Sequence, residues 1–515
     1  MNQSGRQIAK AAALVMALFV VSRVLGLARE MIIGAVFGTS AGYDAYLAAV
    51  RIPDILFTLI AGGALGSAFI PTFTGYFARE DAAGGWRLAS AIVNLLLVAL
   101  TTAAALTWLL APVVVSIVLA PGFARDQQVL TVSLLRVMLV APLFFGVSGV
   151  VMGILNARQH FLLPALAPSL LNLSLIAAAW LLAPRMGVRA LALGYVAGAI
   201  LHLGVQVPGL FLVGARYRPV LILRDPGVLE VLRLMAPRIL GLAAVQINFL
   251  VNTNIASRLG EGAVSALNYA WLLMLLPQGV FAQAVGTAAF PTFAAQAARG
   301  QREEMRATLA ATLRAVFFLS LPATVGLVML ARPLVGLLFE RGAFSASSTE
   351  AVSWALAFYA LGLVGHAGLE IVARAFYALH DTATPVGVGV LAMALNVALS
   401  LTLPGVFGLA GWPPFAGLAL ANSIATLLEL AVLLALIRRK TGGVEGRRML
   451  AAFARSGLAA LVMGVVLTGW QAWLPDAGTF VLGGGGIVLG VAVYLGAALV
   501  LRAEEPRAVV RLIRR

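Results

Sequence analysis

Long apolar stretches recur along almost the whole chain, and short segments with charged residues, proline or glycine separate them. A helix needs roughly 20 apolar residues to cross the hydrocarbon core of a bilayer, and in lipid a spanning helix satisfies its own backbone hydrogen bonds. The pattern predicts an all-α polytopic membrane protein with about fourteen transmembrane helices. The predicted spans lie near residues 10–36, 42–77, 87–119, 127–155, 160–183, 187–213, 228–257, 263–296, 305–338, 348–378, 384–408, 414–438, 449–474 and 478–502.

An internal repeat organises these spans. Segment 64–73 recurs 220 residues later as segment 284–293, with Pro71 matched by Pro291. Further matches keep nearly the same offset, among them 157–164 with 378–385. Repeats with an even number of helices have parallel topology, related by an axis along the membrane normal. The sequence therefore predicts two pseudo-symmetric six-helix lobes at 1–215 and 225–440, two additional helices at 449–502 and a basic cytoplasmic tail at 503–515.

Composition supports a membrane protein and argues against a nucleic-acid partner. The chain has 515 residues, of which 61% are hydrophobic and 11% charged, with a net charge of +16. Its lysines and arginines gather in alternate short loops, as the positive-inside rule requires, which predicts that both termini face the cytoplasm. The absence of cysteine excludes thiolate metal sites and thiol catalysis. The four histidines are too scattered for a metal site, and no nucleophile has a base beside it, so we expect no enzyme.

Ionisable residues deep in a span need a partner, a cavity or a substrate. The first predicted span contains Ser22, Arg23, Arg29 and Glu30. Residues seven apart share a helix face, so Arg23 lies with Glu30 and Ser22 with Arg29, in a polar stripe about two turns long.

The second span adds Asp44 and Arg51, also seven apart, and Pro53, which predicts a kink or a break. Two interpretations stay open. The charged side chains form interhelical ion pairs that fix the packing of the lobe. Alternatively, the arginines, with Ser22, bind an anionic headgroup while Glu30 and Asp44 balance charge in the cavity, because a guanidinium fork matches phosphate bidentately.

The second lobe carries few charges in its central spans. Asn252 and Asn396 are the candidates there for a site that binds a coupling monovalent cation. Asparagine within a span is more often a hydrogen-bonding contact between helices than a ligand. No other cofactor is expected, and the membrane potential is the alternative energy source.

Duplicated lobes are typical of alternating-access carriers, whose substrate site lies between the repeats. The competing interpretation is a duplicated membrane scaffold that transports nothing. Neutral substitution of Arg23 and Arg29 would disable a carrier and leave a scaffold functional.

Several motifs, in this order, resemble those of the MurJ (MviN) family of bacterial lipid II flippases. The resemblance runs through about residues 5–440. The motifs are Ser22 to Glu30, Phe37-Gly38, Tyr43-Asp44-Ala45, Gly63 to Pro71, Ala120 to Phe123, Pro164 to Asn172, Arg374 to Thr382 and Thr384-Pro385.

The resemblance implies a flippase of the multidrug/oligosaccharidyl-lipid/polysaccharide (MOP) exporter superfamily in the bacterial cytoplasmic membrane. Its substrate would be lipid II or a similar polyprenyl-diphosphate glycan, its surroundings membrane lipids, and its partners cell-wall synthesis proteins. By position, the family's diphosphate-binding arginines correspond to Arg23 and Arg29, and its acidic positions to Glu30 and Asp44. Spans 13 and 14 would form a groove for the lipid tail.

The chain departs from the family pattern in two spans. Phe57, Thr58 and Gly62 stand where relatives carry two arginines and a glutamate, and Leu272 replaces an arginine of span 8. Arg51 would compensate in part. A flippase for another polyprenyl-linked glycan, or an exporter of the MATE type, therefore stays an alternative.

Overall fold

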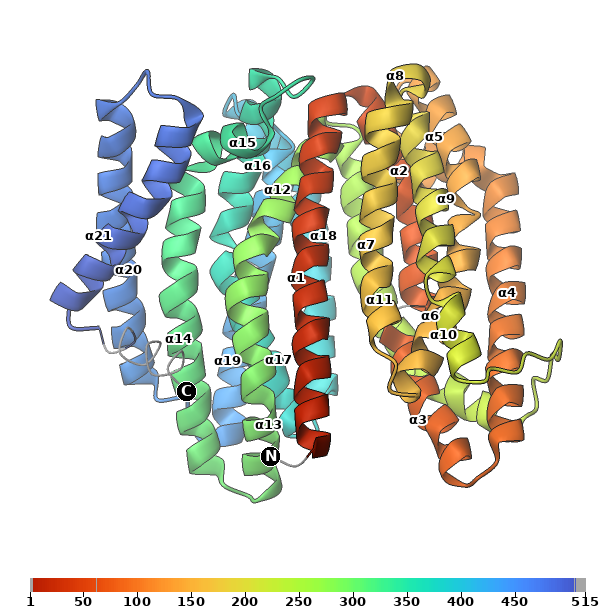
Figure 1. Ribbon diagram of the computed structural model, residues 1–515. Helices are drawn as coiled ribbons and strands as arrows, with labels where there is room; N and C mark the ends of the chain where they lie inside the picture. The colour runs from red at the N-terminus through yellow and green to blue at the C-terminus, as the bar shows by residue number, and fades with distance from the viewer. Residues whose placement is uncertain (1–2, 62, 504, 506–515) are drawn as a thin grey trace. The chain divides into compact units, whose positions relative to one another are not determined.

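The computed structural model describes residues 3–61, 63–503 and 505, and every regular element among them is a helix. The chain divides into two compact units (Figure 1). Unit 1 takes in Met1–Val264 and Arg341–Phe344, and unit 2 takes in Ser265–Glu340 and Ser345–Arg515. The all-α prediction is confirmed.

Unit 1 is built from long helices interrupted by short π-helical turns, labelled η. In chain order these are α1 (Gln3–Phe37), α2 (Ala41–Leu56), η1 (Phe57–Ala61), α3 (Gly63–Ala78), α4 (Ala82–Val113), η2 (Val114–Leu119), α5 (Arg125–Met138), α6 (Ala141–Ala157), α7 (Leu162–Ala177), η3 (Ala178–Leu182), α8 (Ala183–Met186), α9 (Arg189–Gly204), α10 (Val207–Leu212) and α11 (Pro226–Ala256).

Unit 2 continues in the same way after the start of α12. Its elements are α12 (Ala263–Gln278), η4 (Gly279–Gln283), α13 (Ala284–Ala298), α14 (Arg302–Met329), α15 (Ala331–Phe339), α16 (Ala346–Leu361), α17 (Leu363–Ala378), α18 (Ala383–Leu409), α19 (Ala416–Thr441), α20 (Gly446–Trp473), η5 (Phe480–Gly485) and α21 (Gly486–Val500).

Within the described residues, eleven helical segments are long and apolar enough to cross a membrane, or twelve if the bent pair α16–α17 forms one span. These segments fall on the third to the fourteenth predicted spans. Helix α1 occupies the first predicted span, and α2, η1 and α3 occupy the second. The count of about fourteen stays a prediction, whereas the multi-pass architecture is confirmed.

The outer surfaces of the helices are apolar. Leu409 at the end of α18 is 93% exposed and Trp180 in η3 is 73% exposed. Only 22% of the apolar window of Ala82–Leu119 is buried inside the protein. Such surface is costly in water and costs nothing against lipid tails, so these faces are suited to a bilayer.

Close packing inside unit 1 depends on small residues. Helix α9 lies against α7, and a Cβ added at Gly194 would stand 2.5 Å from the Ala178 Cβ. Four residues on, a Cβ at Gly198 would stand 3.2 Å from the Leu171 Cα. Ser174 Oγ donates to the Gly194 carbonyl at 2.8 Å. This is the small-xxx-small contact by which membrane helices approach without a hydrophobic driving force.

The predicted repeat has a structural counterpart. In each half a π-helical turn, η1 or η4, stands directly before the repeated segment, whose helix, α3 or α13, contains Pro71 or Pro291. Upstream, Pro53 lies inside α2 and Pro277 inside α12. Proline removes a backbone donor, and a π-helical turn accommodates the disturbance without ending the span. Pro53 does not break its helix, which continues to Leu56.

The lobes predicted at 1–215 and 225–440 follow the sequence repeat, and they stay a prediction. The compact units divide later, at Val264, so that α11 belongs to unit 1. Helix α11 packs against α3 there. The loop Arg341–Phe344 also belongs to unit 1, where the Ala343 amide donates to the Ala35 carbonyl at 2.7 Å.

Candidate functional site

Arg29 is the centre of a polar network in unit 1. Its Nη1 donates to Asn172 Oδ1 of α7 at 3.0 Å, and its Nη2 pairs with the Glu30 carboxylate at 2.5 Å. Asn172 Nδ2 in turn donates to the Ser22 carbonyl at 3.2 Å. Ser22 lies about two helical turns before Arg29 on α1. The Arg29 Nε–H is buried and has no hydrogen-bond partner among the described residues. The guanidinium is therefore oriented by two partners and retains an unsatisfied donor.

Glu30 is buried, at 6% exposure, and is held from two sides. Besides the ion pair with Arg29, its Oε2 accepts a hydrogen bond from the Tyr43 hydroxyl of α2 at 3.1 Å. Adjacent residues on a helix do not ordinarily face each other. The Arg29–Glu30 ion pair forms because the long arginine side chain can bend back to the neighbouring carboxylate. The expected sharing of a face between Ser22 and Arg29 agrees with their common contact to Asn172.

Arg23 lies outside this network. Its side chain is exposed, and its guanidinium stacks over the Phe19 ring at 5.1 Å from the centroid. Within the part of the chain that the structure describes, no carboxylate forms an ion pair with it. Of Arg23 and Arg29, Arg23 is therefore the one whose charge is open to a ligand.

Asp44 is fully buried near the start of α2. Its Oδ2 accepts a hydrogen bond from the backbone amide of Gly262 at 2.7 Å, immediately before α12. Gly262 has a φ of +81° and a Cβ there would stand 2.8 Å from the Thr39 carbonyl oxygen, so only glycine fits. The described contact makes Asp44 a structural acceptor, and its predicted part in balancing cavity charge is not tested by it.

The far part of α2 contributes a second polar group. Tyr195 of α9 donates its hydroxyl to Asp54 Oδ1 at 2.6 Å. Arg51, one turn before Asp54, places its guanidinium over the Phe249 ring of α11 at 5.6 Å. No role was predicted for Asp54, Asn172, Tyr43 or Tyr195 from the sequence. Polar residues inside apolar spans were the available signal for all four, and only the fold identifies their partners.

Counting Asp54 changes the charge balance of the first two spans. Three arginines, Arg23, Arg29 and Arg51, are accompanied by three carboxylates. The three carboxylates each have a described partner, whereas Arg23 contacts an aromatic ring.

The two candidate cation ligands belong to different compact units. Asn252 Nδ2 donates to Asn248 Oδ1 at 3.3 Å within α11. Asn396 is buried in α18, where its Oδ1 accepts from Ser400 Oγ at 3.0 Å. Each asparagine has a helical neighbour as its described partner, as structural amides in membrane helices do. The structure does not bring them together within one unit.

Among the departures from the family pattern, Phe57 has a clear environment. Its ring packs on that of Phe145 in α6, with centroids 4.8 Å apart. Leu272 is half-buried in α12. Gly62 lies outside the described residues.

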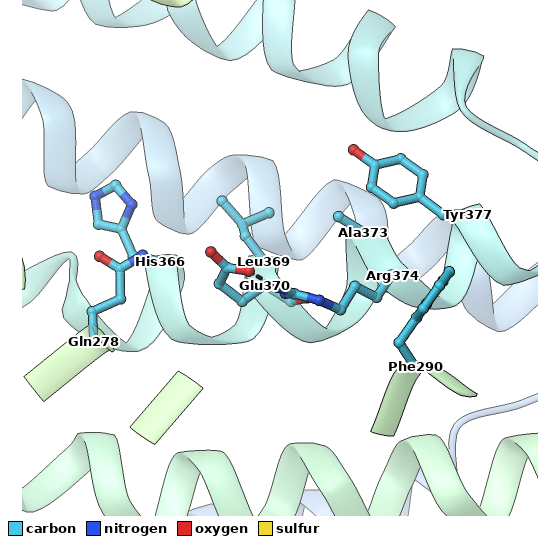
Figure 2. Close-up of a pocket in the computed structure, with 8 residues that line it drawn as sticks. All are labelled: Gln278, Phe290, His366, Leu369, Glu370, Ala373, Arg374 and Tyr377. Carbon is cyan, nitrogen blue, oxygen red and sulfur yellow. Dashed lines mark hydrogen bonds and ion pairs between the residues drawn. The ribbon is translucent and has the colours of Figure 1, made fainter. Parts of the chain in front are cut away.

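A separate cavity, of about 490 Å³, lies inside unit 2, and we call it the unit 2 cavity (Figure 2). An ion pair between Glu370 and Arg374 of α17 lies in its wall. The lining residues are Gln278, Phe290, His366, Leu369, Glu370, Ala373, Arg374 and Tyr377.

An all-helical, multi-pass chain with a polar network around Arg29 in unit 1 has the architecture of a membrane transporter. The family model described as lipid II flippase MurJ matches residues 33–482. The chain belongs to the MurJ lipid II flippase family. The members of this family are transporters and do not catalyse a chemical reaction.

Individual relatives agree over most of their length. A lipid II flippase MurJ of Burkholderia cenocepacia is 36% identical over 431 residues, which is 82% of each chain. A probable lipid II flippase MurJ of Vibrio cholerae is 30% identical over 514 residues, or 96% of each chain.

Solved structures give the same picture. A lipid II flippase MurJ in an inward closed conformation superposes with a TM-score of 0.80 at 25% identity, over 95% of this chain and 98% of that one. An inward-facing MATE family transporter of the MOP superfamily superposes with a TM-score of 0.66 at 16% identity, over 84% of this chain and 99% of that one. The second likeness establishes a shared fold alone.

Proposed function

We propose that this chain moves lipid II, a polyprenyl-diphosphate glycan, from the inner to the outer leaflet of the bacterial cytoplasmic membrane by alternating access. Membership of the MurJ family supports the substrate, since the relatives are named as lipid II flippases. The repeated halves support the transport mode. The observation that carries the proposal is the pair of α1 arginines, with Arg29 held in orientation and Arg23 exposed without a described carboxylate partner.

The diphosphate is the group that needs these arginines. An anion in the hydrocarbon core has a prohibitive Born energy, which paired charges and hydrogen bonds offset. Arg23 offers an exposed guanidinium, and Arg29 and Arg51 lie further along the first two spans. A guanidinium binds phosphate oxygens through two parallel N–H donors. The apolar outer faces of the helices let the polyprenyl tail stay in lipid while the headgroup moves.

The surroundings follow from the same proposal. Both termini face the cytoplasm, in agreement with the arginine-rich loops on that side. A monovalent cation gradient or the membrane potential supplies the energy for transport, since an electrical force acts directly on a substrate that carries charge. Cell-wall synthesis proteins that supply and consume lipid II are the natural partners.

Complementation tests the proposal. A bacterium depleted of its own lipid II flippase is given the wild-type chain, the Arg23→Ala, Arg29→Ala double variant, or Arg23→Lys. We expect growth with wild type, lysis with the double variant, and partial rescue with lysine, which keeps the charge but loses the fork.

The matched control is Arg136→Ala. Arg136 is another arginine of unit 1, stacked over Trp108 at 4.5 Å and away from the α1 network. Its loss should leave rescue intact. Failure of a well-inserted wild-type chain would refute lipid II transport, and rescue by an equally expressed double variant would refute the role of the arginines.

A further inference from the structure

The wall of the unit 2 cavity contains one ion pair, in which each charge is neutralised by the other. Glu370 and Arg374 stand one helical turn apart on α17, and Arg374 Nη1 donates both to the Glu370 carboxylate and to the Glu370 carbonyl at 2.7 Å. An entering anion would meet the carboxylate, and an entering cation would meet the guanidinium. Because the two charges neutralise each other, the cavity favours a ligand that is polar and uncharged.

Gln278 places an unpaired hydrogen-bond acceptor in the wall of the same cavity. It is 9% exposed, at the end of α12, and its Oε1 has no hydrogen-bond partner among the described residues. Figure 2 shows its amide beside His366, at one end of the row of lining side chains. His366 is already held by Asn422, whose Oδ1 lies 3.1 Å from Nε2. A buried amide oxygen without a partner calls for a donor such as a hydroxyl or an amide N–H.

The opposite end of the cavity is aromatic. Phe290 and Tyr377 lie beside Arg374 at this end in Figure 2, and they are 38% and 42% exposed. Exposed rings offer flat apolar faces to a ligand, and the tyrosine hydroxyl adds a donor and acceptor. The cavity thus combines apolar faces with a few convergent polar groups, and its volume of about 490 Å³ is in the range of small-molecule sites.

A sugar matches this combination. Its hydroxyls each donate and accept, which suits a wall that holds a carboxylate, a guanidinium and an amide together. The C–H faces of its ring pack on aromatic side chains. We infer that the unit 2 cavity binds the uncharged, hydroxyl- and amide-bearing sugar of the transported polyprenyl glycan. This inference rests on the proposed function.

The test compares two lipids on the full-length protein in detergent. Affinities for lipid II and for undecaprenyl diphosphate, which lacks the sugar, are measured by native mass spectrometry. Gln278→Leu should weaken lipid II binding about tenfold, the effect of losing one hydrogen bond to a buried amide oxygen, and leave undecaprenyl diphosphate binding unchanged. Arg29→Ala should weaken both.

Gln296→Leu is the matched control. Gln296 is another amide of unit 2 whose buried Oε1 has no hydrogen-bond partner in the part of the chain that the structure describes, and it does not line the cavity. Equal losses for both lipids in Gln278→Leu, or equal effects of Gln278→Leu and Gln296→Leu, would overturn the sugar site while leaving lipid II transport in place. A wild-type chain that binds neither lipid would overturn the proposed function, and the sugar site with it.

Discussion

Asn172 holds Arg29 in place, and replacing it tests whether orientation of this guanidinium matters for binding. The Asn172→Ala change removes the acceptor of the Arg29 Nη1 bond at 3.0 Å and the donor to the Ser22 carbonyl at 3.2 Å. Asn172 is 8% exposed, so water replaces these partners only in part. The first contact has a charged donor and contributes about 1.5–3 kcal/mol, and the second, between neutral groups, about 0.5–1.5 kcal/mol.

Only the contact with Arg29 should affect diphosphate binding. The Arg29 side chain is 24% exposed, so we take the low end of the range, about 1.5 kcal/mol, as the coupling between the two residues. Asn172→Ala should then weaken undecaprenyl diphosphate binding about tenfold in the wild-type background. In an Arg29→Ala background the same change should have an effect of less than about threefold, because the oriented group is already gone.

The assay is a double-mutant cycle of dissociation constants for undecaprenyl diphosphate in detergent. Asn172→Asp keeps an acceptor for Arg29 but adds a negative charge beside it, so this variant should bind the anionic lipid no better than Asn172→Ala. Asn94→Ala is the matched control, since Asn94 Nδ2 makes a similar 2.8 Å bond to the Val220 carbonyl elsewhere in unit 1. Identical factors for Asn172→Ala in both backgrounds would refute the reasoning, because the asparagine would then act independently of the arginine.

Three further predictions concern stability, each measured by thermal unfolding in detergent. Hydrogen bonds from Lys440 and from the hydroxyl and backbone amide of Thr384 hold the pKa of Asp381 at about 2, below its ordinary 3.8. The stabilisation is therefore present above pH about 4 and lost as pH falls towards 2. Asp381→Asn should remove this loss of stability at acid pH, which amounts to less than about 1 kcal/mol in so exposed a pair. The same loss in the variant would contradict the prediction. Gly194→Ala should destabilise by about 1–3 kcal/mol through the clash with η3, and a neutral result would show that the two helices can separate. Tyr195→Phe should lower the free energy of unfolding by about 1.5–3 kcal/mol, because it removes the donor to Asp54. The same substitution should have a smaller effect in an Asp54→Asn background.

Much of the architecture could be predicted from local pattern. A span must satisfy its backbone within itself, so a run of apolar residues decides both the presence of a helix and its approximate ends. The predicted span at 384–408, for example, lies within α18, Ala383–Leu409. The repeat was equally visible, because the Pro71 and Pro291 segments keep their spacing, and the π-helical turns before them add a structural match.

The candidate site could be predicted only in part. The polar stripe of α1 was predicted from spacing, and Arg29 and Glu30 do take part in one network. Its other members are distant in sequence: Asn172 lies 143 residues from Arg29. Tyr195 likewise lies 141 residues from Asp54. Nothing local to either residue indicates such a partner.

The sequence by itself determined that this chain is a multi-pass helical membrane protein with repeated halves, because hydrophobic run length and backbone hydrogen bonding are properties of each segment alone. Tertiary packing selects which polar side chains pair with one another. It separated Arg23 from the Arg29 network, directed Asp44 to a backbone amide, and assembled the unit 2 cavity around Gln278. A polar group in a low-dielectric interior takes the partner that packing places within about 3 Å, and packing depends on helices far apart in the chain.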